Sequence, residues 1–147
     1  MVAQTLATTA TQRRITGRLA EYGGGVSVLT EYINAWVAND PERIAAMVGP
    51  ECVVTECYGP VYRGRDRVLQ WARTWFAAGG VVHRWDTTEH LVVSGHEVAQ
   101  WSFECTWDGN RSTFEGATIA RTAGGLIVAL REYQTTAELY DWGGSWH

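Results

Sequence analysis

Lysine is absent from this chain of 147 residues, so all twelve basic residues are arginine. This absence excludes a Schiff-base lysine and a phosphate-binding loop that depends on lysine. Cysteine is scarce, and its three positions, Cys52, Cys57 and Cys105, form no Cys-x-x-Cys pair. Such usage is typical of a reducing compartment, so we expect a cytoplasmic protein. Gly-x-Ser-x-Gly and Gly-x-Gly-x-x-Gly motifs are also missing, which leaves serine hydrolases and dinucleotide binding without support.

Long apolar runs are missing as well. The run over residues 126–130 is far shorter than the roughly 18 residues that a membrane helix needs, so no membrane partner is expected. The composition, 46% hydrophobic and 19% charged, is that of a folded soluble protein with one domain. Residues 26–147 carry nine arginines against fifteen acids, and this negative charge argues against nucleic acid as a partner.

The chain divides into three parts. Residues 1–25 contain three arginines and one glutamate and end in three glycines, which is typical of a mobile or loosely docked arm. Residues 26–142 are expected to form the domain, and residues 143–147 a C-terminal tail. No internal repeat is present.

Three helices are predicted in the first half of the domain. From residue 26 the apolar side chains follow a helical period that ends near Asn39. Asp40 and Pro41 then supply an N-cap and a first helical residue for a short helix to about Val48. A third helix follows Gly64 and ends at two glycines. The apolar positions that carry the first and third helices are Leu29, Tyr32, Ile33, Trp36, Val37, Val68, Trp71, Ala72, Trp75 and Phe76.

Strands are predicted elsewhere. A short one covers residues 52–57, and four long ones cover residues 81–93, 97–107, 112–122 and 126–135. The short turns between the long strands require antiparallel neighbours, so the fold class is α+β rather than α/β. Because a long twisted sheet is curved, helices on its concave side should leave a cone-shaped pocket. Eight tryptophans and six tyrosines fit an aromatic interior.

Glu132 is the first candidate for chemistry. Strand alternation places it on one face with Val128, Leu130 and Gln134, opposite a face that carries Ile127, Ala129, Arg131 and Tyr133. A carboxyl among apolar neighbours has a raised pKa and can act as a general acid or base. The alternative is a structural ion pair with an arginine on a neighbouring strand, such as Arg121. Alternation leaves both possibilities open.

Four further candidates are weaker. Alternation puts one of Glu56 and Cys57 inward, and Cys57 lacks an activating histidine, which favours an inert thiol over a nucleophile. Glu104, with Glu115 as a possible neighbour, is expected on the outer face. His83, which follows the third helix, is a possible proton shuttle. The histidines show no tight ligand spacing, so we expect neither a metal nor a cofactor.

A family resemblance rests on the order of the elements and on short strings at residues 31–36, 39–41, 62–66, 114–117 and 130–133. Over residues 26–142 the chain resembles the SnoaL-like branch of the nuclear transport factor 2-like superfamily. That resemblance implies three helices packed on a curved antiparallel sheet around a conical, cystatin-like pocket. Members are commonly homodimers paired through the outer sheet face. They include ketosteroid isomerase, scytalone dehydratase, limonene epoxide hydrolase, polyketide cyclases and non-catalytic modules.

The resemblance also implies site residues. Glu132 matches the working acid on the last strand of the hydrolase and cyclase branches. Tyr32 matches the oxyanion-hole tyrosine of ketosteroid isomerase, but Cys57 and Thr118 stand near its two acid positions, so steroid isomerisation is not expected. His83 lies in the region where dehydratases use a histidine. The expected ligand-binding residues are Trp36, Glu56, Cys57, Tyr62, Trp75, Trp101, Thr118, Leu130 and Gln134.

Two functions are consistent with these residues. The first is a cofactor-free lyase, isomerase, cyclase or hydrolase that acts on a small, mostly apolar, cyclic or polyketide-like molecule, with Glu132 as acid or base and Tyr32 and His83 as catalytic partners. The second is a non-catalytic dimeric module that binds an apolar ligand or a protein. An enzyme needs two convergent titratable groups, whereas a binder needs only one orienting polar group.

Overall fold

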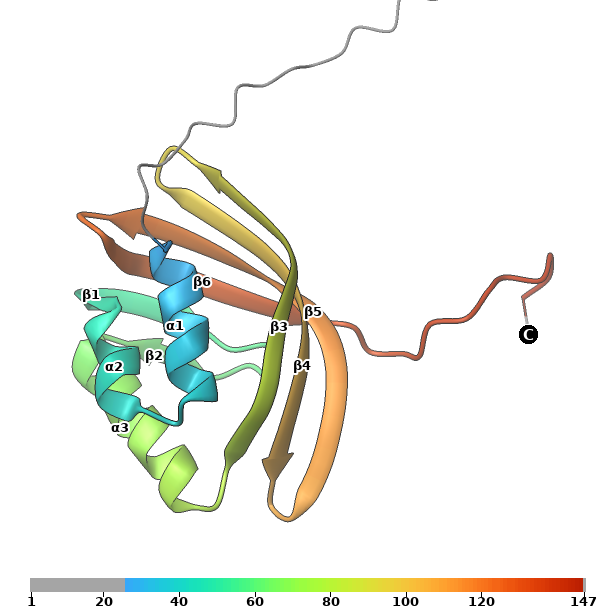
Figure 1. Ribbon diagram of the computed structural model, residues 1–147, viewed down its shortest axis with the longest axis horizontal. Coiled ribbons are helices and arrows are strands. Elements are labelled where there is room, and N and C mark those ends of the chain that lie inside the picture. The colour runs from blue at the N-terminus through green and yellow to red at the C-terminus, as the bar shows by residue number, and fades with distance from the viewer. Residues whose placement is uncertain (1–25, 147) are drawn as a thin grey trace, which may run out of the picture.

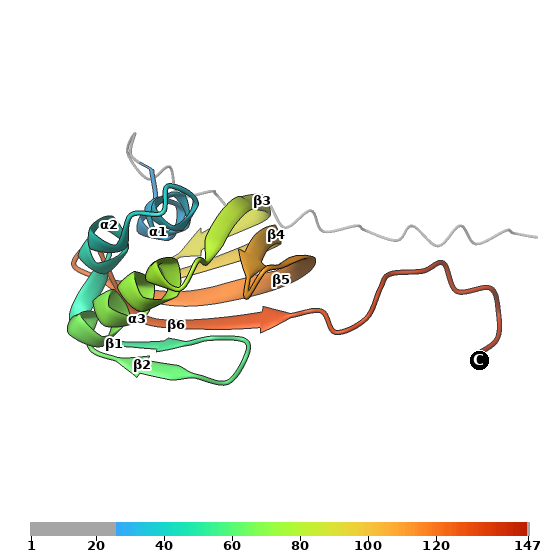
Figure 2. The same ribbon diagram turned by 90° about the horizontal axis from the view of Figure 1, so that it is seen from below.

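The computed structural model describes residues 26–146. The predicted arm over residues 1–25 therefore lies outside the described residues. Three helices lie on one side of a single sheet, and the chain after the last strand leaves the body (Figures 1 and 2). The α+β class and the three helices are confirmed. The elements are α1 (Val28–Val37), α2 (Pro41–Ala46), β1 (Val48–Thr55), β2 (Val61–Arg63), α3 (Arg65–Ala77), β3 (Val81–Val93), β4 (His96–Trp107), β5 (Asn110–Ala123) and β6 (Leu126–Gln134).

Local sequence explains where the helices begin. The Ser27 hydroxyl accepts a hydrogen bond from the Thr30 amide at 3.1 Å and caps α1. The Asp40 carboxylate accepts from the Arg43 amide at 3.0 Å, and Pro41 opens α2. Both caps satisfy amides that the first helical turn leaves without partners. The Asp40–Pro41 signal is thus confirmed. None of the helices in residues 26–146 is long and apolar enough to cross a membrane.

The sheet has the order β2-β1-β6-β5-β4-β3. Strands β3 to β6 form the predicted antiparallel meander. Its turns use residues with positive φ, such as Asp108 (48°) and Gly109 (71°), as tight hairpins require. Two features differ from the prediction: β2 adds a short edge strand, and β1 pairs with β6 in parallel. Strand β1 also begins earlier than predicted, at Val48 instead of residue 52. Pro50 is tolerated inside it because the register between β1 and β6 shifts there, so its missing N–H is not needed for a regular ladder bond.

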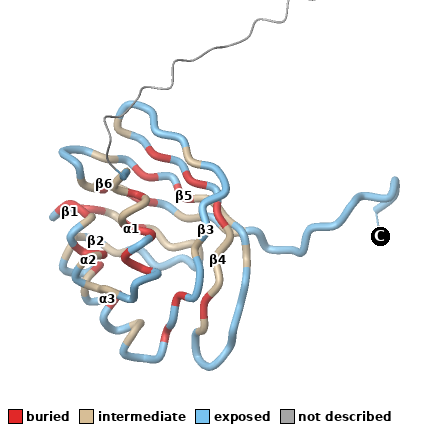
Figure 3. The backbone as a smooth tube through the Cα atoms, viewed as in Figure 1, coloured by how far each residue is buried: buried red, intermediate tan, exposed pale blue. Residues whose placement is uncertain are grey.

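The core lies between α1 and the concave face of the sheet (Figure 3). α1 buries Leu29, Tyr32, Ile33 and Trp36, as its spacing predicts. The sheet contributes buried side chains from β1, β3, β4, β5 and β6. This packing fixes the first helix over the sheet and leaves the pocket beside it.

Strand β6 corrects one part of the predicted alternation. Ile127 is fully buried, although alternation put it on the outer face. The reason is a bulge: Arg121 pairs with Ala129 and Thr122 with Ile127, so Val128 is an extra residue on β6. The residues of β6 before the bulge therefore lie on the side opposite to the one that alternation predicts. Leu130 and Glu132, which follow the bulge, lie on the inner face as predicted.

Gly116 in β5 is required by a close approach. It lies opposite Trp101 in β4 and Gln134 in β6. A Cβ here would overlap the Trp101 ring and the Tyr133 carbonyl oxygen. We expect Gly116→Ala to destabilise the fold by about 1–3 kcal/mol, because the backbone or the ring must move. Urea unfolding measures the change. Gly143→Ala is the control, since no atom lies within 4 Å of a Cβ there, and an equal effect in both variants would contradict the expectation.

Candidate active site

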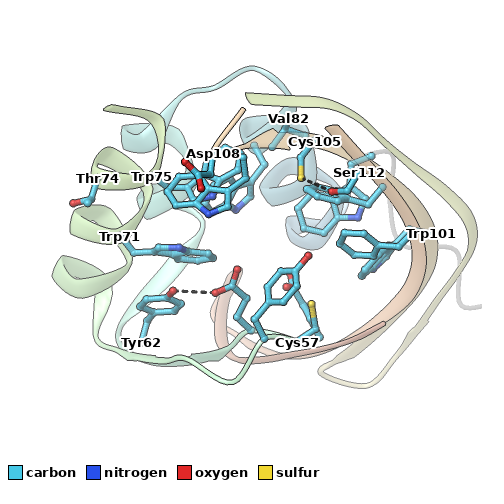
Figure 4. Close-up of a pocket in the computed structure, with 18 of the residues that line it drawn as sticks. Cys57, Tyr62, Trp71, Thr74, Trp75, Val82, Trp101, Cys105, Asp108 and Ser112 are labelled. Carbon is cyan, nitrogen blue, oxygen red and sulfur yellow. Dashed lines mark hydrogen bonds between the residues drawn. The ribbon is translucent and has the colours of Figure 1, made fainter. Parts of the chain in front are cut away.

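A cavity of about 820 Å³ opens between α3, the connection from β1 to β2, and strands β3 to β6. Figure 4 shows Tyr62 and Trp71 on one side of it and Trp101 on the other. Ten of the lining side chains are aromatic: Trp36, Tyr58, Tyr62, Trp71, Trp75, Trp85, Trp101, Phe103, Trp107 and Phe114. The predicted aromatic interior is thus an open pocket rather than a filled core.

The rings form two clusters on opposite sides of the cavity. Tyr62 stacks on Trp71 with centroids 4.1 Å apart, and Trp75 stacks on Trp107 at 5.6 Å. On the opposite side, Phe103 meets Phe114 at 5.2 Å. Helical spacing of four residues puts Trp71 and Trp75 on one face of α3, and alternation along β4 puts Trp101, Phe103, Cys105 and Trp107 on one face of the strand. Each of these rings is therefore positioned by a helix or a strand, whereas Tyr58 lies in the connection from β1 to β2.

Glu132 lines the cavity, as strand alternation predicts. Burial raises the pKa of its carboxyl to about 8, and the negative charge of nearby Glu56 adds to the effect. Among residues 26–146, Glu132 forms no ion pair. Arg121, the alternative partner, pairs with Ala129 through the backbone and is exposed. The described residues thus give no support to the structural ion pair.

Glu56 is a second carboxyl in the same cavity. It follows β1, and its Oε2 accepts a hydrogen bond from the Tyr62 hydroxyl at 3.0 Å (Figure 4). Burial raises the pKa of Glu56, and the Tyr62 bond opposes that shift. Two carboxyls from distant parts of the sequence therefore converge on one apolar space.

Cys57 also faces the cavity. Alternation predicted only one of Glu56 and Cys57 inside, but β1 ends at Thr55 and the turn that follows points both inward. The Cys57 thiol donates to Gln134 Oε1 at 3.6 Å. Burial, with Glu132 and Glu56 nearby, raises its pKa to about 12, so the thiol is protonated at neutral pH. This supports an inert cysteine.

Tyr32 lies in α1 with no exposed surface, and it is not one of the residues that line the cavity. Its hydroxyl has no hydrogen-bond partner among the described residues. Burial and the charge of Glu132 raise the pKa of Tyr32 well above its ordinary value. Tyr32 is thus a neutral phenol near Glu132, and it makes no hydrogen bond to that carboxyl.

His83 does not reach the cavity. Its side chain is exposed, and its Nε2 atom lies 2.8 Å from the Thr106 hydroxyl. The physical reason is strand alternation, because Val82 is the residue that β3 turns inward. The predicted placement of His83 beside the other candidates is therefore wrong.

The predicted ligand-binding residues fall into three groups. The main cavity is lined by Trp36, Glu56, Cys57, Tyr62, Trp75 and Trp101. Thr118 and Leu130 are buried in the core, where Thr118 accepts a hydrogen bond from the Trp101 indole at 2.8 Å. Gln134 lines a neighbouring cavity of about 560 Å³, which shares Glu56, Cys57 and Glu132 with the main one. Thr118 and Leu130 thus support the wall instead of forming its surface.

Glu104 and Glu115 lie away from the pocket. Glu104 forms ion pairs with Arg111 at 2.5 Å and Arg84 at 3.6 Å, and the Arg111 hydrogen bond lowers its pKa. Glu115 is exposed and pairs with Ser102 across the hairpin, not with Glu104. Within residues 26–146, no group of three or more acids, histidines and cysteines could hold a metal ion.

Several lining residues were not predicted. Tyr58, Trp71, Trp85, Phe103, Trp107 and Phe114 complete the aromatic wall. The period-four spacing of α3 contained the signal for Trp71, and alternation with Trp101 contained the signal for Phe103. Other unpredicted residues lie at the cavity's more exposed positions, among them Arg67, Gln70, Thr74, Asp108, Asn110 and Ser112.

Residues 29–130 match the model of the SnoaL-like domain. The chain belongs to the SnoaL-like domain family. No curated protein matches the sequence.

Solved structures show which folds this SnoaL-like domain is similar to. A hypothetical protein with a ketosteroid isomerase-like fold from Catenulispora acidiphila, in complex with trimethylamine, is 18% identical with a TM-score of 0.67, over 74% of this chain and 85% of that one. An LEH-like epoxide hydrolase from M. tuberculosis is 15% identical with a TM-score of 0.67, over 74% and 80%. An NTF2-like protein of unknown function from Burkholderia pseudomallei is 17% identical with a TM-score of 0.62, over 74% and 88%. At these identities the likeness shows the fold alone.

Proposed function

We propose that this SnoaL-like protein is a cofactor-independent acid/base enzyme, a lyase, isomerase, cyclase or hydrolase. Its substrate is a small, mostly apolar, cyclic or polyketide-like molecule. The observation that carries the proposal is the convergence of the Glu132 and Glu56 carboxyls on one aromatic cavity. An apolar binding module needs only one orienting polar group, so two titratable groups favour catalysis.

The two carboxyls differ in the way that acid/base chemistry requires. With a pKa of about 8, Glu132 is mostly protonated at neutral pH and can donate a proton to a substrate oxygen. Burial raises the pKa of Glu56 as well, but the Tyr62 hydroxyl donates a hydrogen bond to it and stabilises its ionised form. Glu56 is therefore the base that takes a proton from substrate or water. Groups whose environments separate their pKa values divide acid and base roles in this manner.

Two of the lining tryptophans carry an indole N–H that is closed off from the open cavity. The Nε1 atoms of Trp36 and Trp85 are buried, and neither has a hydrogen-bond partner among the described residues. Negative charge that develops on a substrate oxygen would therefore be stabilised by proton donation from Glu132. An epoxide or a carbonyl compound meets this requirement, and the epoxide hydrolase among the similar folds lends support.

The experiment is incubation of the purified protein with a panel of cyclic epoxides and of polyketide-like β-dicarbonyl compounds, with products followed by mass spectrometry. Turnover that depends on Glu132 supports the proposal. Saturable binding without turnover of any class on the panel would favour the second candidate, the binding module.

The homodimer stays a prediction. Leu91, Val98 and Ile119 are exposed and occupy one row across β3, β4 and β5, where Leu91 pairs with Val98 and Val98 with Ile119. Such an apolar row on the outer sheet face is a surface that a second copy would cover.

A further inference from the structure

The side chains around the cavity are unusual for an apolar site. Within residues 26–146, the side chains that line the cavity include ten aromatic ones and one aliphatic one, Val82. A neutral hydrocarbon would be held equally well by leucine or isoleucine, because burial of apolar area does not depend on the kind of apolar group. Aromatic faces differ by their negative electrostatic potential, which attracts cations.

The charges in the cavity have the same sign as the ring faces. Its charged lining residues are three acids, Glu56, Asp108 and Glu132, and one base, Arg67. Arg67 is exposed, and its guanidinium donates to Gln70 at 2.9 Å instead of to a carboxylate. Within residues 26–146, neither Glu56 nor Glu132 has an arginine partner. Positive charge is therefore what the deep part of the cavity lacks.

The neighbouring cavity does not change this balance. It contains Arg63 and Arg131, and both side chains are exposed. The Arg131 guanidinium lies over the Tyr133 ring, 5.2 Å from its centroid. It therefore faces away from Glu132, its neighbour in β6, as alternation requires.

We propose that the cavity selects a molecule that carries a positively charged nitrogen, a quaternary or protonated tertiary ammonium, on an apolar body. The aromatic wall holds the ammonium by cation–π attraction, and the Glu56 carboxylate neutralises its charge together with Glu132 when that group is ionised. The apolar body fills the rest of the 820 Å³. This inference deepens the proposed function and rests on it for the site, since it names the substrate class.

Ligand charge should couple to the protonation of Glu132. The titratable groups close enough to Glu132 for their charges to interact are Tyr32 from α1, Glu56, Cys57 and Tyr58 from the β1–β2 connection, and Tyr62 from β2. All of them are acids, so each is neutral or negative. A bound cation favours the ionised form of Glu132 and lowers its pKa. Affinity for the cation should therefore rise between pH 6 and pH 9, whereas affinity for a neutral analogue should not.

The test compares two ligands of equal shape. Benzyl(2-hydroxyethyl)dimethylammonium carries a permanent charge, and 3,3-dimethyl-4-phenylbutan-1-ol replaces its nitrogen by carbon. Binding is measured by tryptophan fluorescence and calorimetry at pH 8. We expect the cation to bind at least about tenfold more tightly, as roughly 1–2 kcal/mol of cation–π attraction in a desolvated site gives. Equal or tighter binding of the carbon analogue, or no binding of the cation, overturns the inference.

Variants assign the preference to its source. The double change Glu56→Gln and Glu132→Gln should remove most of the preference while the neutral ligand still binds. Glu115→Gln is the matched control, because that carboxyl is exposed and does not line the cavity. Trp107→Leu is a second, milder variant, because this ring of the wall is half-exposed. It should weaken binding of the cation and leave binding of the neutral ligand unchanged. A preference that survives both the double change and Trp107→Leu contradicts the inference.

This experiment separates the two proposals. Cation preference without turnover of charged or neutral substrates would overturn the enzyme and leave the ligand class standing. Turnover of neutral substrates together with equal binding of the two probes would overturn the ligand class and leave the enzyme standing.

Discussion

Replacement of Glu132 by glutamine is expected to slow turnover by about a hundredfold to ten-thousandfold, the usual contribution of a positioned general acid or base. The amide keeps the shape of the carboxyl but cannot transfer the proton. Substrate binding should change little for a neutral substrate, so the loss should appear in kcat and not in KM. Steady-state kinetics on the substrate identified by the panel measures both.

Glu115→Gln is the matched control for this variant, because it removes an exposed carboxyl outside the cavity. Its rate should equal that of the unchanged protein. A Glu132→Gln protein with full activity would remove Glu132 from the mechanism, even though the residue lines the pocket.

The second large effect concerns stability against pH. Burial raises the pKa of Glu132 to about 8 in the folded protein, from 4.5 in the unfolded chain. Between these values the folded state holds a proton that the unfolded state has lost, so the free energy of unfolding falls as pH rises from about 4.5 to 8. Each pKa unit corresponds to about 1.4 kcal/mol, which makes the total several kcal/mol. Urea unfolding at pH 5, 7 and 9 measures it.

Glu132→Gln should abolish most of this decrease and make the protein more stable than the original at pH 9. The amide avoids the cost of an ionised carboxylate in an apolar site. Glu56 contributes a decrease of the same sign in both proteins, so the difference between them isolates Glu132. A buried ion pair would give the opposite result, with glutamine less stable at neutral pH because an arginine loses its partner.

Local signals predicted much of the fold. The helical spacing of Leu29, Tyr32 and Trp36 identified the buried face of α1, and the turns at residues 94–95, 108–110 and 123–125 predicted the meander. The parallel pairing of β1 with β6 has no local signal, since it joins segments at opposite ends of the domain. The bulge at Val128 is equally hidden, because it depends on how two strands fit and not on the residues of one.

The candidate site was predicted in part for the same reasons. Alternation placed Glu132 correctly because the bulge lies before it in the strand. His83 was suggested by its position in the region where related dehydratases use a histidine. Alternation along β3 turns Val82 inward and therefore turns the neighbouring His83 outward. Glu56 was identified as a candidate, but its bond to Tyr62 depends on how the turn after β1 folds back into β2, which alternation cannot describe.

The parallel pairing of β1 with β6 also decides when the two carboxyls first meet during folding. Glu56 follows β1, whereas Glu132 lies on β6, the last of the described strands. Contacts between segments so far apart close a long loop and form slowly. On the ribosome, β1 leaves the exit tunnel well before β6 is made, so its edge toward β6 is unpaired during most of synthesis. The chemistry of the pocket is thus assembled in the final step, when the closing strand brings its acid to a partner that has been present from the start.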